Sequence, residues 1–508
     1  MATRTRFVMC AAAIFCIAPL VARAGDEARS TSTRSTSSEL HVGLMTPRFT
    51  LNEAILTALR RNPDILKGIQ EIERTKGVVL EITAQALPHV TPNANFNFTD
   101  PKLNTTRSST LNGPPNSGFQ SAPNVKLTQY SYQINVTGSQ LVANYSTFRA
   151  IRGTFFQRDS AYFAFRNILD QVIATVKTQF YQVVVNLALI GVQEEQVRLL
   201  ESQLKDQQNR FEAGTVPRFN VLQAQVALSN QIPQLISARN AYRISQLQLA
   251  KTLGLDFDPR RGGGPPLEAV GDLPFEDRPI ALVSAIEMGK QRRPFLKQAR
   301  ANVLNQIEQV HVALGGFMPN FTSTGGYEVI SSPFNTSIDD VSRGWVFGLQ
   351  GNWNLWDSGE TYGRVKQQRA ILSQQKITYD DDVRQVELEI QQAYSNLIQN
   401  KELIQSQEKN VEQANEALRL AKARLDAGAG TQLDVLNAQV QLATAESTKL
   451  QALFGYNASL AEFDRVTGEQ STYTEAFNGI TPHATRSTIY DTSSDRDAAG
   501  DWKRNASH

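Results

Sequence analysis

The chain of 508 residues carries 51 lysine and arginine residues against 49 aspartate and glutamate residues, which gives a formal net charge of +2. This near balance offers no electrostatic reason for binding to nucleic acid. The length allows one large or two modest domains, and the two cysteines, Cys10 and Cys16, both lie close to the N-terminus. The composition therefore argues against a nucleic-acid partner and, beyond the N-terminal segment, against a disulfide framework.

The N-terminus has the features of a secretory signal peptide. Arg4 and Arg6 precede an apolar run from Phe7 to Ala22, and a small-x-small cleavage site ends at Ala24. We expect residues 1–24 to be removed, so that the exported chain has no cysteine. No later stretch offers the roughly 20 apolar residues that a membrane-spanning helix requires. Any membrane contact must therefore come from another kind of structure.

Two stretches of the chain resemble each other, which predicts an internal two-fold repeat. The segment AGTVPRFNVLQAQVAL (Ala213–Leu228) agrees with AGAGTQLDVLNAQVQL (Ala427–Leu442) at half of its positions. Each is preceded by a series in which every seventh residue is apolar. These residues are Leu169, Val176, Val183, Ile190, Val197, Leu204 and Phe211, and then Val383, Ile390, Leu397, Ile404, Val411, Leu418 and Leu425. A sustained seven-residue period predicts long coiled-coil helices with left-handed supercoil, and two ordinary amphipathic helices are the alternative.

Each copy opens with a shorter helical unit, since LNEAILTALRRNPDIL (Leu51–Leu66) aligns with LVSAIEMGKQRRPFLK (Leu282–Lys297). The long helix expected from about Leu141 to Ala213 would span about 110 Å at about 1.5 Å per residue. Helices expected at about Asn62–Leu87 and Val216–Gly254 could be stacked end to end along it. Each copy thus predicts one long helix covered by two shorter ones.

Each copy also contains two strand-like segments in which apolar and polar residues alternate. We expect strands at Asn93–Phe98 and Tyr130–Val136, and at Asn320–Val329 and Trp345–Trp353. The expected lipid-facing residues are Tyr130, Tyr132, Ile134, Val136, Trp345, Phe347, Leu349 and Trp353. Aromatic residues on one face and amides on the other are typical of a transmembrane β-barrel in contact with outer-membrane lipid. A soluble hairpin with one buried face is the alternative.

The predicted organisation runs from the signal peptide to a polar C-terminal tail. A polar disordered linker (25–47) leads to repeat 1 (48–260), which has a β-hairpin at 89–140 and a helical tip at Gly214. A second linker (261–278) leads to repeat 2 (279–468), which has a β-hairpin at 318–356 and a helical tip at Gly428, and the tail (469–508) follows. The predicted fold class is α+β, with long antiparallel coiled-coil helices and four β-strands per chain.

The number of strands predicts an oligomer. About eight strands are the minimum for a closed barrel, and each unpaired backbone group at a sheet edge in lipid costs several kcal/mol. Strands of several copies must therefore combine, and the amide-rich face requires a water-filled lumen. The helices have no globular body to cover them and should form a curved wall, with polar heptad positions such as Asn186 and Asn400 near water.

This ordered set of motifs resembles the TolC-like outer-membrane factors, the outer membrane efflux protein family. The resemblance is carried by FTLNEAILTALRRNPDIL (Phe49–Leu66), the paired AG…VLxAQVxL turns and LWDSGETYGRV (Leu355–Val365), and it covers about Arg48 to Gly468. It implies a homotrimer whose strands form one outer-membrane barrel and whose helices form a periplasmic α-barrel. It also implies docking to a periplasmic adaptor (membrane fusion) protein and to an inner-membrane pump of the RND or ABC type.

The tips of the long helices carry candidate contact residues. Gly214 and Gly428 end long helices, where a left-handed backbone conformation is needed and glycine adopts it at least cost. Together with Thr215 and Gly430 they form the tip turns, which the resemblance implies to be the periplasmic entrance and part of the adaptor contact. The tyrosine and arginine of the family's tip latch are replaced here by Leu425 and Gly430.

The candidate entrance and gating residues are Asp434, Asn437, Asn220, Glu212 and Asp426. Asp434 lies three residues after Thr431 and is either the acid of a helix capping box or, as the resemblance implies, part of a carboxylate ring that favours cations. The family has a second acid where this chain has Asn437, and the corresponding place in the first copy is Asn220. Glu212 and Asp426 precede the tip glycines, and either solvation or pairing with Arg210, Arg424 or an adaptor explains them.

No set of residues supports catalysis. The histidines are scattered without metal-ligand spacing, and no Gly-rich phosphate loop, HExxH or GxSxG motif occurs. The sequence predicts no enzyme activity, cofactor or metal. The leading hypothesis is a passive outer-membrane channel that extends into the periplasm, within a tripartite efflux or type I secretion system. The alternative is a non-channel periplasmic coiled-coil structural protein, and the sequence leaves efflux and polypeptide secretion undecided.

Overall fold

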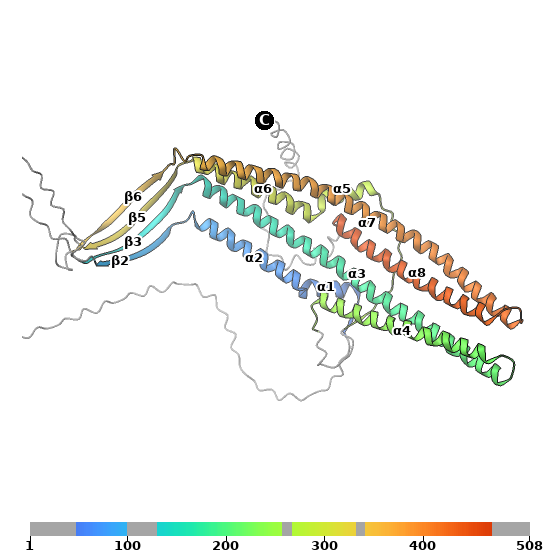
Figure 1. Ribbon diagram of the computed structural model, residues 1–508. Coiled ribbons are helices and arrows are strands. Elements are labelled where there is room, and N and C mark those ends of the chain that lie inside the picture. The colour runs from blue at the N-terminus through green and yellow to red at the C-terminus, as the bar shows by residue number, and fades with distance from the viewer. Residues whose placement is uncertain (1–46, 99–129, 257–266, 332–340, 470–508) are drawn as a thin grey trace, which may run out of the picture. The chain divides into compact units, whose positions relative to one another are not determined.

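A computed structural model describes residues 47–98, 130–256, 267–331 and 341–469 of the chain (Figure 1). The predicted signal peptide, almost all of the linker 25–47 and almost all of the tail 469–508 lie outside the described residues. The side chain of Tyr130 also lies outside them.

The described helices and strands follow the same order in the two halves of the chain. The first half contains α1 (Leu51–Arg61), α2 (Pro63–Ala84), β2 (His89–Phe98), β3 (Tyr130–Ala143), α3 (Tyr145–Glu212) and α4 (Arg218–Leu253). The second half contains α5 (Leu282–Arg292), α6 (Pro294–Leu314), the 3₁₀ turn η2 (Gly315–Phe317), β5 (Asn320–Ser331), β6 (Val341–Asn352), α7 (Glu360–Asp426) and α8 (Gln432–Thr467). Two short strands, β1 (Arg48–Phe49) and β4 (Glu268–Ala269), pair in parallel.

The two short helices of the first half begin at well-formed caps. Thr50 and Glu53 form a capping box at the start of α1, and the Asn62 side chain accepts hydrogen bonds from the first turn of α2, where Pro63 occupies the first position. The equivalent starts of α5 and α6, at Ala281 and Arg293, have no side-chain cap. The corner between α5 and α6 must therefore be held by contacts with other helices.

The helices lie side by side, and α3 has the largest number of helical neighbours. It packs against α1, α2 and α4 and also against α6 and α8, whereas α7 packs against α5, α6 and α8 (Figure 1). The shorter helices α2 and α4 both contact α3, which confirms that two shorter helices lie along the long one. The helices α3 and α7 contain 68 and 67 residues, so each spans about 100 Å at about 1.5 Å per residue.

Most residues of the two heptad series face the interior. Leu169 and Val176 of α3 and Ile390 and Ile404 of α7 are fully buried, and they belong to separate hydrophobic clusters of the two halves. The expectation that Asn186 lies near water is wrong. This side chain is buried and donates a hydrogen bond from Nδ2 to the carbonyl oxygen of Ala241 at 3.3 Å, so α4 covers it.

One described helix meets the length and composition criteria for crossing a membrane, which the sequence analysis did not expect. Helix α3 contains an 18-residue window with a mean hydropathy of 1.3, of which 44% is buried. The helix supplies Leu169, Val176 and Val183 to the largest hydrophobic cluster. A core helix of this kind meets the same criteria, because its apolar residues serve packing between helices.

The four longer strands form one antiparallel sheet in the order β2-β3-β5-β6. Each strand leads directly into a helical segment or leaves one, so the sheet continues from one end of the helices (Figure 1). The Gln140 side chain fixes this junction by donating a hydrogen bond to the carbonyl oxygen of Ala86 at 2.7 Å. Within the described residues, β2 and β6 each have a strand partner on one side alone.

Candidate functional site

The register of the sheet places the expected lipid-facing residues on a single face. Val136 pairs with Tyr327, which in turn pairs with Trp345, and directly paired residues share a face. By alternation Tyr132, Ile134, Phe347 and Leu349 lie on this same face. Trp345, Phe347 and Leu349 are 70%, 76% and 69% exposed, so no other described part of the chain covers their side of β6.

Aromatic packing organises this apolar face. The rings of Tyr327 and Trp345 meet edge to face with centroids 5.3 Å apart, and Trp345 stacks on Phe347 at 6.0 Å. Phe347 also covers Gly325, where an added Cβ would lie 2.9 Å from the ring. Trp353 lies one residue beyond β6 and donates a hydrogen bond from its indole nitrogen to the carbonyl oxygen of Phe317 at 3.0 Å.

The opposite face of the sheet is rich in amides and hydroxyls. Asn93 and Asn95 of β2 pair with Asn135 and Gln133 of β3, and the Gln133 side chain donates a hydrogen bond to Glu328 of β5. The carbonyl oxygen of the Asn135 side chain is buried without a hydrogen-bond partner. A polar surface of this kind needs water on its side, because unpaired amides are costly in an apolar environment.

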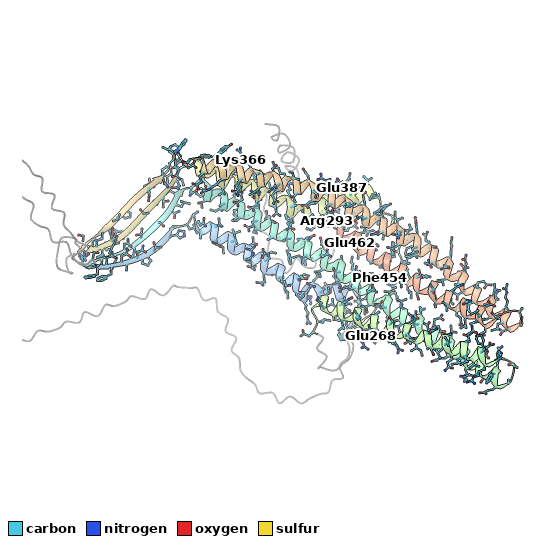
Figure 2. The ribbon with its side chains drawn as sticks, viewed as in Figure 1. Glu268, Arg293, Lys366, Glu387, Phe454 and Glu462 are labelled. Atoms are coloured by element: carbon cyan, nitrogen blue, oxygen red, sulfur yellow. The ribbon has the colours of Figure 1, made fainter. Side chains whose placement is uncertain are left out.

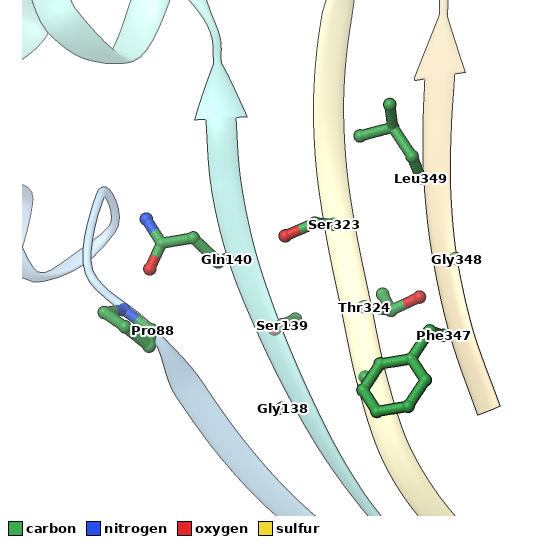
Figure 3. Close-up of a pocket in the computed structure, with 10 residues that line it drawn as sticks. Pro88, Gly138, Ser139, Gln140, Ser323, Thr324, Phe347, Gly348 and Leu349 are labelled. Atoms are coloured by element: carbon green, nitrogen blue, oxygen red, sulfur yellow. The ribbon is translucent and has the colours of Figure 1, made fainter. Parts of the chain in front are cut away.

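A hollow of about 520 Å³ lies where the sheet meets the helices (Figure 3). Its lining residues are Pro88, Gly138, Ser139, Gln140, Ser323, Thr324, Gly325, Phe347, Gly348 and Leu349. None of these side chains is charged, and Figure 3 shows mostly small side chains around the space. The hollow therefore has no acid, base or metal ligand, and the described residues as a whole contain no cluster of three potential metal-binding side chains.

The two helical tips have the same backbone geometry. Gly214 and Gly428 both have a φ of 72°, the left-handed conformation expected for a helix-ending glycine. In each turn the amide of the residue after the glycine, Thr215 or Ala429, donates a hydrogen bond of 2.9 Å to the carbonyl oxygen five residues earlier. Both long helices therefore end in the same tight reversal.

Asp434 forms the capping box that the sequence predicts. Its carboxylate accepts hydrogen bonds from the backbone nitrogen of Thr431 at 2.8 Å and from the Thr431 hydroxyl at 2.7 Å. These backbone and side-chain hydrogen bonds, with a smaller contribution from Arg424, lower the pKa of Asp434. The carboxylate is therefore ionised at neutral pH, and it is exposed on the surface of α8.

The other predicted entrance residues surround the tips without forming a cluster. Asn437 is exposed three residues after Asp434 and so shares its face of α8, whereas Asn220 is partly buried near the start of α4. Glu212 and Asp426 are exposed, and neither has an ion-pair partner among the described residues. Arg210 pairs with Asp206 at 2.9 Å and not with Glu212.

Gly430, where the resemblance implies an arginine, is tightly surrounded in the turn. A Cβ atom at this position would lie 3.0 Å from both the Arg424 Cβ and the Leu425 backbone nitrogen. Leu425 itself is partly buried against the apolar cluster of the α7–α8 hairpin. Any side chain at Gly430 would therefore require its neighbours in the turn to shift by a few tenths of an ångström.

Sequence reasoning missed a row of buried glutamines between α3 and α8. This glutamine seam consists of Gln196 and Gln207 of α3 and Gln432 and Gln439 of α8. It contains two long hydrogen bonds of 3.4 Å, from Gln207 Nε2 to Gln432 Oε1 and from Gln196 Nε2 to the Gln439 carbonyl oxygen. Gln207 Oε1, Gln432 Nε2 and Gln439 Oε1 are buried without partners. The seven-residue spacing of Gln432 and Gln439 is the one signal in the sequence that could indicate this seam.

The glutamine seam contrasts with the interior of the α7–α8 hairpin. There Leu418, Val435 and Leu442, together with three alanines, form a continuous hydrophobic cluster. Farther along the α3–α8 contact, burial and the neighbouring Glu195 carboxylate raise the pKa of Glu446. Near the tips, the α7–α8 hairpin is therefore held together well internally and is held weakly to α3, whereas farther from the tips Lys177 of α3 pairs with Asp464 of α8 at 3.0 Å.

A buried charge cluster lies where the α5–α6 corner meets α3, α7 and α8. Arg293, which is labelled in Figure 2, pairs with Glu389 of α7. Its Nε and Nη1 atoms are buried without hydrogen-bond partners. Although burial opposes the effect, hydrogen bonds from Gln385 and Arg293 lower the pKa of Glu389. This cluster could not be predicted from the sequence, because its members come from three separate helices and the α5–α6 corner.

Asp170 of α3 is the buried acid of this cluster. Burial raises its pKa to about 6, although the guanidinium groups of Arg166, Arg465 and Arg293 favour the charged form. Since the folded pKa lies above the ordinary value of 3.8, the folded chain binds more protons than the unfolded chain between about pH 4 and pH 6. The stabilisation that Asp170 provides is therefore complete below this range and is lost as the pH rises through 6.

We expect Asp170→Asn to stabilise the protein at pH 7.5 by about 1 to 3 kcal/mol, because one pKa unit corresponds to about 1.4 kcal/mol. The difference from the wild-type protein should shrink as the pH falls toward 4. Thermal unfolding in detergent between pH 4 and pH 8 measures both effects. Asp381→Asn, an exposed residue paired with Arg384, is the matched control. Destabilisation of the Asp170 variant at pH 7.5 would show that attraction to the arginines outweighs burial.

Comparison with known proteins assigns the chain to a family. The family model for outer membrane efflux protein matches residues 54–255 and 285–469, which is more than half of the chain. Outer membrane efflux protein BepC of Brucella suis biovar 1 (strain 1330) is 28% identical over 199 residues, 39% of this chain and 41% of that protein. Alkaline protease secretion protein AprF of Pseudomonas aeruginosa is 22% identical over 337 residues, 64% of this chain and 67% of that protein.

A solved structure has the same fold. The CmeC outer membrane channel of Campylobacter jejuni superposes with a TM-score of 0.69 at 16% identity, and the match covers 84% of this chain and 88% of that chain. The predicted family resemblance and the α+β fold are thus confirmed, and membership of a family of outer membrane efflux proteins confirms that the chain is not an enzyme. The chain therefore belongs to the outer membrane efflux protein family, the TolC-like outer-membrane factors, and is located in the outer membrane.

Proposed function

We propose that three copies of the chain form a passive channel through the outer membrane, with the helices as a tunnel that extends into the periplasm. The observation that carries this proposal is the four-stranded sheet. It has one continuous apolar face, one polar face and two edge strands, β2 and β6, with a strand partner on one side alone among the described residues. Such a sheet suits a lipid boundary on one side and a water-filled lumen on the other.

The edge strands support assembly from several copies. A sheet in lipid cannot leave backbone groups of its edges unpaired, so β6 of one copy should pair with β2 of the next. The choice of three copies rests on the family. The residues proposed to face lipid are Tyr130, Tyr132, Ile134, Val136, Trp345, Phe347, Leu349 and Trp353.

An internal duplication of the chain accounts for the two similar hairpins. The same order of elements in both halves, the equal tip turns and the two-part match of the family model support it. The proposed boundaries stay at 48–260 for repeat 1 and 279–468 for repeat 2. The duplication supplies two β-hairpins and two helical hairpins per copy, which three copies would arrange as a ring.

The glutamine seam supports a gating movement at the tips. Buried amides with long or missing hydrogen bonds make a weak contact, since each unpaired buried group costs about 1 to 3 kcal/mol. The α7–α8 hairpin can therefore separate from α3 as a unit while its hydrophobic cluster stays intact. In this proposal the tip turns at Gly214, Thr215, Gly428 and Gly430 are also where a periplasmic adaptor docks.

Asp434 is proposed to form a cation-favouring ring where three copies converge at the periplasmic entrance. Its exposure and its lowered pKa support a permanent negative charge at that position. Asn437 and Asn220 would border this ring as neutral groups. Glu212 and Asp426, which have no ion-pair partner in the described chain, would add negative charge near the tips.

We expect Asp434→Ala to abolish block of the channel by multivalent cations and to reduce selectivity for monovalent cations several-fold. Conductance in planar bilayers measures both. Loss of the capping box should also destabilise the start of α8 by about 1 kcal/mol. Asp434→Asn is therefore the better-matched variant, because asparagine keeps one cap acceptor. Unchanged cation block in both variants would contradict the carboxylate ring, and Asp434 would then serve only as the capping residue of α8.

The class of transported substrate divides the known relatives. BepC is named an efflux protein, whereas AprF is named an alkaline protease secretion protein. We place this chain with small-molecule efflux or type I secretion, with transport driven by an inner-membrane pump of the RND or ABC type. Co-purification with cross-linking in the native host would identify that pump and its adaptor.

Reconstitution of the full-length protein tests the proposal as a whole. The channel hypothesis expects extraction from the outer membrane in detergent, a trimeric mass and discrete conductance steps in planar bilayers. The alternative, a structural periplasmic coiled-coil protein, expects a soluble chain without conductance. A monomer in aqueous buffer with its sheet packed against its own helices would contradict the channel.

A further inference from the structure

The turn between β6 and α7 exposes two large apolar side chains. Leu355 is 77% exposed, and Trp356, at 88%, is the most exposed large apolar side chain of the described chain. The corresponding residue near the end of β3, Val142, is smaller and is 53% exposed. The second half of the chain thus presents a tryptophan where the first half presents a valine.

This turn is fixed on both sides of Trp356. On one side the Trp353 indole nitrogen donates its hydrogen bond to Phe317. On the other side the Asp357 carboxylate accepts hydrogen bonds from the backbone nitrogens of Gly359 at 3.1 Å and Thr361 at 2.8 Å. Because hydrogen bonds hold both sides, the exposure of Trp356 is a property of the fold and not of a loose loop.

Cationic and aromatic side chains continue from this turn along α7. Tyr362, Lys366 and Arg369 follow one another at spacings of four and three residues, so they share one face of the helix. All three are exposed, and neither Lys366 nor Arg369 has an ion-pair partner among the described residues. Arg364, which lies between Tyr362 and Lys366 in sequence, instead pairs with Glu360. Figure 2 labels Lys366 near the end of the helices that adjoins the sheet.

The chemistry of this surface matches a membrane interface. Tryptophan and tyrosine rings concentrate where hydrocarbon meets headgroups, because one end of the ring is apolar and the other is polar. Unpaired lysine and arginine beside such rings attract anionic headgroups. The surface also continues the apolar row of β6, which runs from Trp345 through Leu349 toward Leu355.

We propose that Leu355, Trp356, Tyr362, Lys366 and Arg369 form a binding surface for an anionic phospholipid on the periplasmic side of the membrane. Leu355 and Trp356 insert at the edge of the hydrocarbon, and Lys366 and Arg369 bind the headgroup phosphate. The surface would set the depth at which the channel sits in the bilayer. The proposal rests on the barrel proposed above and adds a partner to it.

The test uses full-length protein in vesicles of phosphatidylglycerol or phosphatidylcholine with brominated acyl chains, which quench tryptophan fluorescence. In the wild-type protein, lipid brominated near the headgroup should quench the emission of Trp356. This part of the quenching should be absent in Trp356→Phe. Lipid brominated deep in the acyl chain should quench the emission of Trp345, and this part of the quenching should be absent in Trp345→Phe. The two variants separate the interface from the barrel.

The charge of the headgroup is tested with two further variants. Lys366→Gln and Arg369→Gln should each lower the preference for phosphatidylglycerol over phosphatidylcholine about fivefold, which corresponds to about 1 kcal/mol per cation. Arg364→Gln, whose cation is paired, should leave the preference unchanged. Native mass spectrometry of bound lipids in mixed vesicles gives the ratio.

Three outcomes would overturn the lipid surface while leaving the channel intact. The first is quenching in Trp356→Phe equal to that of the wild type, which would mean that a neighbouring copy covers the turn. The second is a preference for phosphatidylglycerol in Lys366→Gln and Arg369→Gln that equals that of the wild type. The third is a loss of this preference in Arg364→Gln as large as in those two variants. Absence of Trp345 quenching together with absence of conductance would instead contradict the proposed function itself.

Discussion

A double variant with lysine at both Phe347 and Leu349 is expected not to insert into the outer membrane. Both side chains lie on the apolar face of the edge strand β6 and are largely exposed. A lysine on the lipid side of a barrel costs about 2 to 4 kcal/mol near the middle of the membrane. Each copy would carry two such charges, so insertion would be disfavoured by about 4 to 8 kcal/mol per copy. Fractionation and detergent extraction of cell envelopes measure the inserted amount.

The alternation of β6 offers a matched control for this experiment. Val346 and Gln350 lie on the opposite face of the same strand, so lysine at these two positions should be tolerated in a water-filled lumen. Insertion at the wild-type level in the Phe347 and Leu349 variant would show that lipid does not contact this face. If neither double variant inserted into the outer membrane, the result would show that β6 tolerates no charge on either face, and it would not support lipid contact of one face.

Replacing Gln207 and Gln432 with leucine is expected to hold the channel closed. The two glutamines face each other across α3 and α8 with one hydrogen bond of 3.4 Å and two unpaired buried atoms. Leucine removes the unpaired amides and adds apolar contact, which should strengthen the seam by about 2 kcal/mol per copy. We therefore expect at least a tenfold lower open probability in planar bilayers, with an unchanged conductance of the events that remain.

The hairpin α3–α4 supplies the control for the glutamine seam. Gln231 donates a hydrogen bond to Gln193 between these two helices, which the proposed movement does not separate. Leucine at Gln193 and Gln231 should leave the open probability unchanged. Wild-type gating in the Gln207 and Gln432 variant would mean that the α3–α8 contact does not part during opening.

The strands could be predicted from alternation, but their ends could not. The aromatic pattern predicts a strand from Trp345, whereas β6 begins at Val341, because β5 offers pairing partners as far as Ser331. The long helix was predicted from about Leu141 and begins at Tyr145. Leu141 and Ala143 still pair with β5, and Asn144 then caps the helix by accepting a hydrogen bond from Thr147. Long-range pairing outweighs local helix propensity there.

Local chemistry at the tips could be read from the sequence, and contacts between distant helices could not. The glycine turns and the Thr431–Asp434 capping box depend on neighbouring residues alone, and the structure has them. The glutamine seam depends on which face of α8 meets α3, and the cluster around Asp170 joins three helices and the α5–α6 corner. A heptad period indicates that a face is buried but not which partner covers it.

Because α7 has few helical neighbours within its own chain, we expect a variant allele that locks the channel to be dominant. Among the described helices α7 packs mainly against α5, α6 and α8, and Ile377 and Leu388 stay exposed on it. In a ring of copies the part of that surface around Ile377 and Leu388, beyond the lipid-binding residues 362–369, would meet the adjacent subunit, so no hairpin could swing outward without displacing the chain beside it. A cell that expresses wild-type and leucine-locked alleles together should therefore be sensitive to transported toxins, with the locked allele dominant.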